Sequence, residues 1–358
     1  MNIRLRVSGC LALACFLFSI LAVRAAEPGL QIYWIDVEGG GGTLIVTPAR
    51  ESILIDAGWP TGPSAERIRD AATNAGLARI DYFILTHFHT DHYGGAAPLS
   101  RLIPIGTVMD NGIPDHDPDG KNNAHFLQAI QPYREFKADR REIVQPGSAL
   151  QLKQTDAATP LSFRFMGARK QFIHPEGMGG PNSLCGEGTQ KATDTTDNAN
   201  SVVSLVQFGP FKFFDGGDLT WNMEGELVCP TNSIGHVDVY QVDHHGFDIS
   251  NNPLLVRSLA PTVTVMNNGA RKGSGKETLA TLRSVSSIQT MYQMHRDTQG
   301  GAEVNTDNEF IANIDVPCAG NYIKCSVEPS GKSYTISIPA KGYSKTYLTR
   351  TAEAVGGN

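Results

Sequence analysis

The sequence predicts an α/β protein with two mixed β-sheets, most of which lies between residues 28 and 316. Apolar runs with the alternation or continuity typical of strands recur along the chain, and helical patterns and glycine-rich turns separate them. The 358 residues suffice for one large α/β domain or two ordinary ones. The apolar and charged fractions are those of a soluble globular protein.

The first half of the chain is predicted to form a β meander, a helix and a buried strand. The four strands are expected at residues 31–37, 43–47, 52–58 and 81–87. The four glycines at 39–42 indicate a tight turn, without the Gly-Lys-Ser/Thr ending of a nucleotide loop. A helical pattern runs from Ser64 to Ala78 with Ser64 as its N-cap, and another helix is expected beyond His92.

The second half is predicted to contain a hairpin, further strands and one clear helix. The expected strands are at residues 201–209, 211–218, 236–246, 262–269, 287–295 and 334–340. The helix is expected at 276–285, and polar loops of the kind that shape binding sites are expected at 111–125 and 174–200. We expect one domain over residues 26–316, followed by a C-terminal β extension over 317–358.

The first 25 residues have the layout of a secretory signal peptide. Arg4 and Arg6 give a positive start, an apolar run extends from Leu11 to Val23, and a small-residue cleavage pattern precedes Ala26. That run is short for the alternative, a transmembrane anchor crossing ~30 Å of hydrocarbon. We therefore expect residues 1–25 to be removed, leaving a periplasmic or secreted protein with no membrane span.

The mature chain is expected to be acidic. Without its leader it keeps 27 basic and 36 acidic residues, a net charge of −9. An acidic surface disfavours polyanionic partners such as DNA. A small-molecule or phosphoester substrate is therefore expected in preference to nucleic acid, and no oligomeric state is predicted.

Four cysteines remain in the mature chain, an even number typical of disulfide-bonded exported proteins. Cys318 and Cys325 are seven positions apart with a glycine between them, which favours a local bridge across a hairpin. Cys185 and Cys229 would then form a long-range pair. The alternative is that all four are buried thiols.

The segment THFHTDHYGG, residues 86–95, concentrates metal ligands at the end of a predicted buried strand. Its ligand side chains, within six positions, are His87, His89, Asp91 and His92. Imidazole nitrogen and carboxylate oxygen suit Zn²⁺ and similar ions. We expect His87 and His89 to hold one ion, and Asp91 and His92 to hold a second at the ~3.5–4 Å separation of two-metal hydrolases.

This motif resembles the signature of the metallo-β-lactamase superfamily. Between about residues 31 and 315 the order of motifs is similar to one branch, the hydrolase domain of ComEC-type DNA-uptake proteins and the related phosphorylcholine esterases. Those motifs are a glycine-rich turn after Asp-Val, an Asn-rich turn before a strand, a Gly-Asp pair and a His-His-Gly triplet. The resemblance implies a four-layer αβ/βα sandwich with the metal site at one edge of two facing sheets.

The resemblance also implies ligands at later strand ends. A bridging aspartate is expected after glycine, where Asp218 fits better than Asp215. For the final histidine we favour His244 as a metal ligand and His245 as a catalytic group near the substrate, and the reverse assignment remains the alternative. Asp91 and Asp218 are expected to contribute to catalysis as well as to metal binding.

The chain departs from the superfamily at one expected ligand. Many members have a histidine some twenty residues before the bridging aspartate, where this chain has Asn198, Asn200 and Ser201. The ion held by His87 and His89 is therefore expected to bind less tightly. Two Zn²⁺ ions are the expected cofactor, with Mn²⁺ or Fe as alternatives.

Together these residues imply an exported, metal-dependent hydrolase that uses a metal-bound hydroxide on a phosphodiester or phosphoester. The first alternative is a lactonase or β-lactamase-like hydrolase of a carbonyl substrate, although such enzymes usually keep the third histidine. Two further possibilities are a nuclease and a non-catalytic zinc-binding module.

Several polar residues outside these motifs receive weaker predictions. Asp56 and Asp243 are candidates to orient ligand histidines. Tyr93 is expected to pack in the core, with a position facing the pocket as the alternative. His295 is a candidate substrate contact at a strand end. A phosphate-binding role is considered for Lys272 and Lys276. The loop histidines are expected to be ordinary surface residues; they are His116, His125 and His174.

Overall fold

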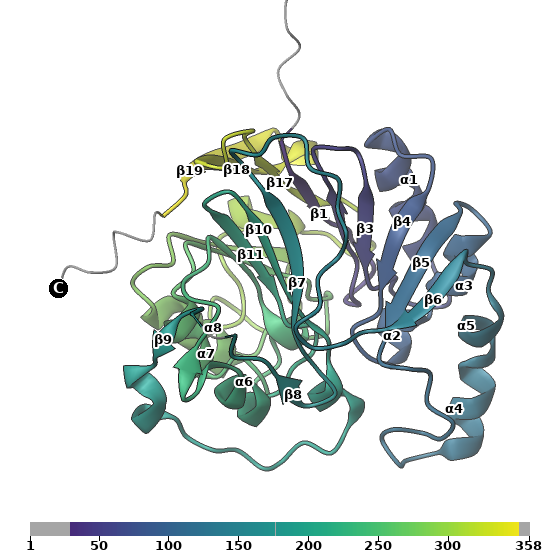
Figure 1. The fold of residues 1–358 in the computed structure, drawn as a ribbon, viewed down its shortest axis with the longest axis horizontal. Coiled ribbons are helices and arrows are strands. Elements are labelled where there is room, and N and C mark those ends of the chain that lie inside the picture. The colour runs from purple at the N-terminus through teal and green to yellow at the C-terminus, as the bar shows by residue number, and fades with distance from the viewer. Residues whose placement is uncertain (1–28, 176, 351–358) are drawn as a thin grey trace, which may run out of the picture.

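The computed structural model describes residues 29–175 and 177–350, so the expected leader at 1–25 lies outside the described residues. Two mixed sheets face each other (Figure 1). The nine-stranded sheet contains, from edge to edge, β19 (Tyr343–Leu348), β18 (Ser333–Ile338), β17 (Ile323–Val327), β1 (Gln31–Trp34), β2 (Thr43–Val46), β3 (Ser52–Ile55), β4 (Ile80–Ile84), β5 (Ile105–Asp110) and β6 (Arg140–Ile143). The eight-stranded sheet contains β16 (Ile311–Asn313), β15 (Thr290–His295), β14 (Val263–Met266), β13 (Val239–Gln241), β11 (Phe211–Asp215), β10 (Val203–Phe208), β7 (Leu161–Ala168) and β8 (Gln171–Phe172).

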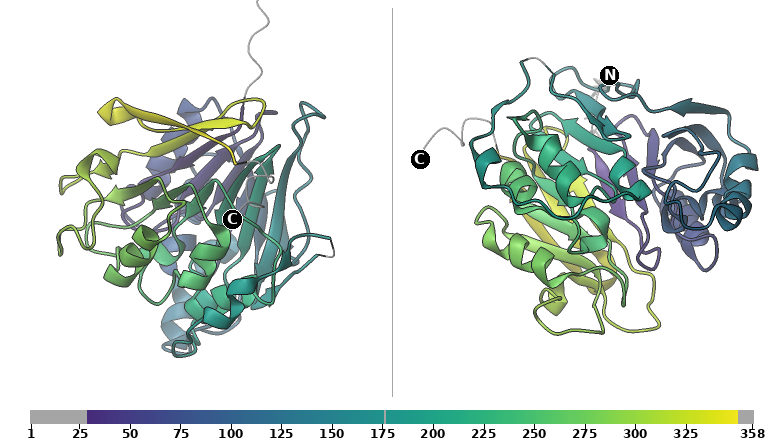
Figure 2. Two further views of the ribbon diagram at one scale, coloured as in Figure 1. Left: turned by 90° about the vertical axis from the view of Figure 1, so that its left-hand side faces the viewer. Right: turned by 90° about the horizontal axis from the view of Figure 1, so that it is seen from below.

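Helices cover the outer faces of both sheets. Those that pack on the nine-stranded sheet are α1 (Ser64–Asn74), α3 (Ala96–Ser100), α4 (Asn123–Ala129) and α5 (Gln131–Glu135), and the short α2 (Thr90–Tyr93) follows β4. Those that pack on the eight-stranded sheet are α6 (Trp221–Val228), α7 (Pro253–Leu259) and α8 (Lys276–Ser284). The right-hand view of Figure 2 shows the two groups on opposite sides of the molecule. None of the described helices is both long and apolar enough to span a bilayer.

Three apolar clusters hold the layers together. The largest lies between the two sheets and includes the buried Trp34, Phe163 and Tyr292. A second joins the nine-stranded sheet to its helices through residues such as Ile68, and a third joins the eight-stranded sheet to its helices through residues such as Leu255. The four-layer αβ/βα sandwich expected from the sequence is therefore confirmed.

Parallel pairing brings the candidate ligands to one edge of the sandwich. β3, β4 and β5 are parallel neighbours, as are β11, β13 and β14. The carboxyl ends of neighbouring parallel strands meet at the same edge of a sheet. The segments that follow these strands carry Asp56, residues 86–95, Asp218 and the His244–His245 pair.

The start of α1 differs from its prediction. The helix begins at Ser64, whose hydroxyl accepts a bond from the Trp59 amide (3.3 Å), while Pro63 holds the N-cap position. Ser64 is therefore not the N-cap. The helix ends at Asn74, short of the predicted Ala78, because Gly76 turns the chain with a φ of 73°.

The C-terminal strands continue the nine-stranded sheet. β17 pairs antiparallel with all four residues of β1, and β18 and β19 follow it in hairpin order. Tyr334 and Ile336 of β18 lie in the cluster between the sheets. The segment expected as a β extension thus contributes side chains to the central core.

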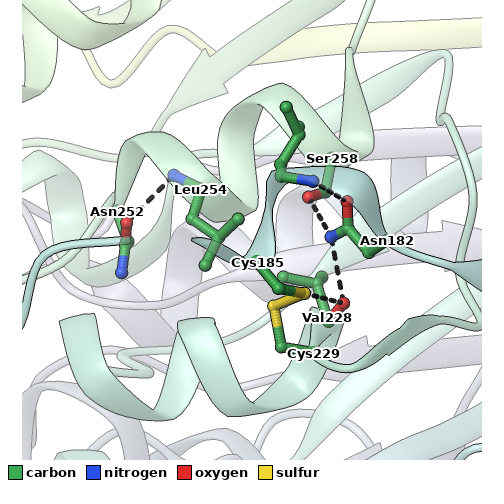
Figure 3. Close-up of a disulfide and its surroundings, with 8 residues drawn as sticks. Asn182, Cys185, Val228, Cys229, Asn252, Leu254 and Ser258 are labelled. Carbon is green, nitrogen blue, oxygen red and sulfur yellow. Dashed lines mark hydrogen bonds between the residues drawn. A yellow bond between two sulfur atoms is a disulfide. The ribbon is translucent and has the colours of Figure 1, made fainter. Parts of the chain in front are cut away.

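A disulfide joins Cys185 to Cys229, the expected long-range pair (Figure 3). Asn182 stabilises the same corner, because its side-chain amide donates to the Val228 carbonyl (3.0 Å) and to the Ser258 hydroxyl (2.7 Å). The local bridge expected between Cys318 and Cys325 is wrong, since both are free. Cys325 points from β17 into the core between the sheets, whereas Cys318 lies in the loop before that strand.

Candidate metal centre

The histidine-rich turn after β4 rests on Asp56, the residue that follows β3. Asp56 accepts bonds from the Thr86 amide and hydroxyl, both at 2.8 Å, and from Nδ1 of His92 at 2.6 Å. Its φ of 60° is a left-handed conformation that non-glycine residues seldom adopt. Asp56 therefore orients His92, as expected from the sequence.

Four imidazole nitrogens surround one carboxylate oxygen. The distances from Asp218 Oδ2 to the Nε2 atoms are 3.8 Å for His87, 3.2 Å for His92, 3.6 Å for His244 and 3.4 Å for His245. Asp91 Oδ2 also lies 3.4 Å from His92 Nε2 and 3.2 Å from His245 Nε2. All six residues are buried.

Hydrogen bonds at the opposite ring nitrogens determine the tautomers. The Thr86 hydroxyl gives its proton to Asp56, so it accepts from Nδ1 of His87 (3.0 Å). The Ser250 hydroxyl likewise donates to the Leu219 carbonyl and accepts from Nδ1 of His244 (3.1 Å). The last two Nδ1 atoms face acceptor oxygens, Asp56 Oδ2 for His92 and Asn267 Oδ1 for His245. In its neutral form, each ring therefore presents an Nε2 lone pair toward Asp218.

This arrangement fits metal ions. Nε2 atoms of His92 and His245 face each other at 3.2 Å, and Nε2 of His87 is buried without a hydrogen-bond partner among the described residues. Lone pairs at such separations repel unless a cation or a proton lies between them, and an unpaired buried polar atom costs about 1–3 kcal/mol. The donor set of imidazole and carboxylate is the one that Zn²⁺ and similar ions prefer.

The burial and close spacing of these residues also shift their pKa values. Burial lowers the pKa of His244 to about 4 and the pKa of His87 well below its usual value, so both rings are neutral ligands. Burial opposes ionisation of Asp218, yet the neighbouring His245 and His92 hold the pKa of its carboxyl well below the usual range. Asp218 is therefore an anion at neutral pH.

The two histidines of the His-His-Gly triplet point into different halves of the site. Both adopt left-handed conformations with φ of 53°, and their ring centroids lie 6.1 Å apart. Successive left-handed residues cost roughly 1–3 kcal/mol each and persist where the surroundings enforce them. The strained turn places His245 beside Asp91 and His92, and His244 on the side of Asn198.

The geometry places His245, which the sequence favoured less as a ligand, within the tightest group. Ligand atoms of Asp91, His92, Asp218 and His245 all lie within 4.8 Å of one another. His244 Nε2 instead lies 3.4 Å from Nδ2 of Asn198, near the position where the superfamily histidine is missing.

His89 is oriented by a residue that sequence reasoning missed. Both carboxylate oxygens of Asp119 lie 3.1 Å from its Nε2, which leaves Nδ1 with the free lone pair. Asp119 is held in turn by Lys121 (2.8 Å) and by the backbone amide of Asp197 (2.9 Å). Asp119 lies within the polar loop 111–125, and an acidic side chain in a loop expected to be functional was the available signal.

A comparison with protein families bears on the first half of this site. Residues 38–164 match the model of the metallo-beta-lactamase superfamily. This stretch of the chain is therefore similar to a metallo-beta-lactamase superfamily domain. The match covers His87, His89, Asp91 and His92 and ends before the remaining candidate ligands.

Two curated relatives share parts of this domain. Recombination protein 2 of Haemophilus influenzae is 26% identical over 268 residues, which are 74% of this chain and 27% of the relative. Atrochrysone carboxyl ACP thioesterase of Passalora fulva is 33% identical over 92 residues, 25% of this chain and 26% of the relative. The chain thus spans about a quarter of the length of each relative.

Solved structures of metallo-beta-lactamase-fold proteins are also similar. A diphosphatase of the PhnP family is 13% identical, with a TM-score of 0.35 over 73% of this chain and 94% of its own. CmlA, a diiron beta-hydroxylase from Streptomyces venezuelae, is 14% identical, with a TM-score of 0.38 over 73% of this chain and 48% of its own.

A cavity of ≈ 400 Å³ opens beside the metallo-beta-lactamase motif. It is lined by His89, Asp91 and Trp59 on one side and by the 117–129 segment, including Lys121 and His125, on the other. His125, expected to be an ordinary surface residue, therefore borders the site. The polar loop that carries Asp119 forms one wall of this cavity.

Lys272 is the cation nearest to the candidate ligands. Its ammonium contacts Asp91 Oδ2, donates to the Gly39 carbonyl (2.7 Å), and lies 5.1 Å from the ring centre of Trp59. Lys276 lies away from the site and pairs with Glu303 (3.6 Å). Of the two lysines considered from the sequence, the structure therefore brings Lys272 to the site.

The remaining candidates lie outside the group of ligand atoms around Asp218, although Tyr93 also lines the cavity beside the motif. Tyr93 is buried and packs edge-on against Tyr133, as expected. Asp243 is fully buried, and its carboxylate has no hydrogen-bond partner among the described residues, so it does not orient a ligand histidine. His295 pairs with Asp36 at 2.7 Å, on the far side of the glycine-rich turn. His116 and His174 are exposed.

Proposed function

We propose that the protein is an exported dinuclear metallohydrolase that cleaves phosphodiesters or phosphoesters. The observation that carries the proposal is the convergence of four imidazole lone pairs on Asp218 Oδ2, within 3.2–3.8 Å, with the Lys272 ammonium against the same cluster. The converging imidazole lone pairs are typical of a metal centre. The Lys272 ammonium adds a positive charge that favours an anionic substrate.

The residues divide into two proposed ligand groups that share Asp218. His87, His89 and His244 would hold one ion, and Asp91, His92 and His245 would hold the other. When bound, two such ions supply Lewis-acid polarisation of a phosphoryl oxygen and lower the pKa of water to ~7. Asp218 would bridge the ions, so its loss would remove a ligand from both.

Lys272 would bind the substrate. With ions neutralising Asp91, the ammonium is free to pair with a non-bridging phosphate oxygen at the mouth of the site. Trp59, beside Lys272 and on the cavity wall, offers an apolar face for a leaving group. The Asp119 loop, opposite Trp59, would select among leaving groups by shape.

Hydrolysis of a carbonyl substrate is the second candidate. The thioesterase of Passalora fulva, 33% identical over 92 residues, acts on an acyl thioester by its name. Lactones and thioesters are therefore the substrates to compare with phosphoesters. A nuclease is disfavoured by the net charge of −9 expected after leader removal.

Export is proposed from two features. The first 25 residues have the pattern of a signal peptide. The Cys185–Cys229 disulfide suits an oxidising compartment such as the periplasm or the cell exterior. Both features support a periplasmic or secreted protein. Fractionation of cells that express the whole chain, with an antibody to the protein, tests this.

The activity is tested with bis(p-nitrophenyl) phosphate, a lactone and an acyl thioester, offered to the mature chain with zinc or manganese. We expect metal-dependent release of nitrophenol. Asp218→Ala should reduce turnover by at least ~100-fold, because both ions lose a ligand. Lys272→Met should raise KM for the phosphodiester more than it lowers kcat.

The outcomes separate the candidates. Turnover of the lactone or thioester alone, unaffected by Lys272→Met, would overturn the phosphoester proposal and support hydrolysis of a carbonyl substrate. Metal-loaded protein that hydrolyses none of the three substrates would argue against all three reactions and for a non-catalytic module.

A further inference from the structure

A second cluster of ligand-type side chains lies on the other side of the glycine-rich turn. Asp36, Glu38, His295 and Cys318 each place one ligand atom within 4.8 Å of the others. They come from distant parts of the chain: the turn after β1, the end of β15, and the loop between β16 and β17. None of them belongs to the candidate metal centre.

The thiol of Cys318 has more acceptors than it has protons. Its sulfur lies 3.0 Å from Asp36 Oδ2 and 3.1 Å from Glu38 Oε1. A thiol carries one proton and can satisfy one of these oxygens. The second contact sets a sulfur lone pair against a carboxylate, which is repulsive, and the cation beside them is Arg67, whose second guanidinium nitrogen lies 3.5 Å from the sulfur. The candidate metal centre shows the same excess of lone pairs.

Arg67 is the cation already present, and it leaves the cluster short of positive charge. One guanidinium nitrogen lies 2.9 Å from both Asp36 Oδ2 and Glu38 Oε1 and 3.1 Å from the Asp36 carbonyl. Three oxygens thus compete for its two protons. With His295 neutral, as a metal ligand must be, two carboxylates against one guanidinium leave a net charge of −1. A divalent ion with Cys318 as thiolate would bring the total to zero.

We propose that Asp36, Glu38, His295 and Cys318 form a second, structural metal site that takes a thiophilic divalent cation of the Zn²⁺ class. Four ligands of the types sulfur, nitrogen and oxygen suit tetrahedral Zn²⁺, in which ligand atoms lie about 3.3–3.8 Å apart. Hard ions such as Ca²⁺ and Mg²⁺ prefer all-oxygen sites. Arg67 would not bind the ion and would continue to pair with the carboxylates of Asp36 and Glu38.

Such an ion would brace the turn that supports the candidate metal centre. The turn runs from Asp36 to Gly42, and its Gly41 amide donates to the Asp91 carbonyl (3.1 Å). The loop that carries Cys318 is a segment between two strands, β16 and β17, of opposite sheets. The ion would therefore fasten both sheets to the turn without contacting the substrate.

Cobalt substitution tests the proposal, because only this site would place a thiolate on a metal. The candidate metal centre contains no cysteine, and Cys185 and Cys229 are disulfide-bonded. We expect Co²⁺, titrated into the reduced-thiol mature protein, to produce a near-ultraviolet thiolate-to-cobalt band whose final intensity corresponds to one cobalt–thiolate bond per chain. Cys318→Ala should abolish the band. Cys325→Ala, which removes a buried thiol outside the cluster, should keep it.

A second readout guards against a variant that does not fold. In the wild-type protein, zinc should protect the half-buried Cys318 from a thiol reagent, and a chelator should restore its reaction. A folded wild type that gives no thiolate band, or a band that persists in Cys318→Ala, would overturn the site. This result is independent of the proposed hydrolase activity, because Asp218→Ala should keep the band whether or not the protein cleaves phosphoesters.

Discussion

At the scale of single residues, the candidate metal centre depends on groups that touch no substrate. Asp56, Thr86, Ser250 and Asn267 each hold one ring nitrogen of a ligand histidine and so direct the other toward Asp218. Such partners typically contribute 10–100-fold to metal affinity. Their carboxylate, hydroxyl and amide groups are common hydrogen-bond acceptors, and only their position beside an imidazole gives them this role.

Ser250→Ala tests the orienting role at His244. The change removes the acceptor for Nδ1 of His244 and should weaken one of the two bound ions by roughly 10–100-fold. Isothermal titration with zinc is the measurement. Ser204→Ala is the matched control, because that buried hydroxyl has no partner among the described residues. Equal zinc affinities in both variants and wild type would contradict the orienting role.

At the scale of elements, the glycine-rich turn and the strained His-His turn shape the centre. Gly41 admits no side chain, because a β-carbon there would lie 2.6 Å from Asp56 Oδ2 and 2.8 Å from Nδ1 of His92. The turn therefore packs directly on the pair that orients the motif. In the His-His turn, the left-handed conformations of His244 and His245 direct two successive side chains into different ligand groups.

Gly41→Ala should lower both metal content and turnover, because the added carbon displaces the Asp56 carboxylate from His92. We expect a loss of about 10-fold or more in zinc affinity, with a folded protein by circular dichroism. Gly186→Ala has open space around the added carbon and serves as control. Unchanged zinc binding in Gly41→Ala would show that the turn is not a rigid support.

Helix α6 carries a buried acid that links stability to pH. Glu224 accepts bonds from the Asn251 and Asn252 amides (2.7 and 2.6 Å), and burial raises its pKa to about 7. Between pH ~4.5 and 7 the folded state holds a proton that the unfolded state has released. The free energy of unfolding should therefore fall as pH rises through this window.

Glu224→Gln should make that part of the pH profile less steep, since the amide does not titrate, while buried acids such as Asp215, with a pKa raised to about 7, and Asp238, with a pKa raised to about 6, keep the remaining slope. The measurement is Tm at intervals from pH 5 to 8 for both proteins. The variant starts from a lower Tm, because its amide NH₂ group cannot accept a bond from a backbone amide, whereas each oxygen of the carboxyl group accepts one. Identical slopes in the two profiles would show that Glu224 does not titrate in this range.

At the scale of the whole molecule, the C-terminal strands are part of the core. β17–β19 supply seven buried side chains to the cluster between the sheets; they are Ile323, Cys325, Val327, Tyr334, Ile336, Ile338 and Tyr347. Burial of each is worth about 1.5–3 kcal/mol. Their sum matches or exceeds the 5–15 kcal/mol by which a typical protein is stable.

A chain that ends at residue 316 should therefore not fold. We expect it to lack near-ultraviolet circular dichroism and a cooperative thermal transition. The control is Thr335→Ser in the full-length chain, a mild change on the outward face of β18, which should melt within a few degrees of wild type. A folded, metal-binding 26–316 fragment would instead establish that segment as an independent domain.

The residue pattern alone predicted two mixed sheets with helices and the ligand cluster at residues 87–92, because strand periodicity and a dense histidine motif are local signals. The four-layer sandwich and the later ligands were expected from the family resemblance. Tertiary structure decided the rest. Whether His244 or His245 meets Asp91 depends on two left-handed residues, and the Asp119–His89 pair depends on a loop that returns from 30 residues away. Cys318 meets Asp36 across 282 positions instead of bonding to Cys325 nearby. Local sequence carries no record of such contacts, because they are set by how two sheets pack face to face.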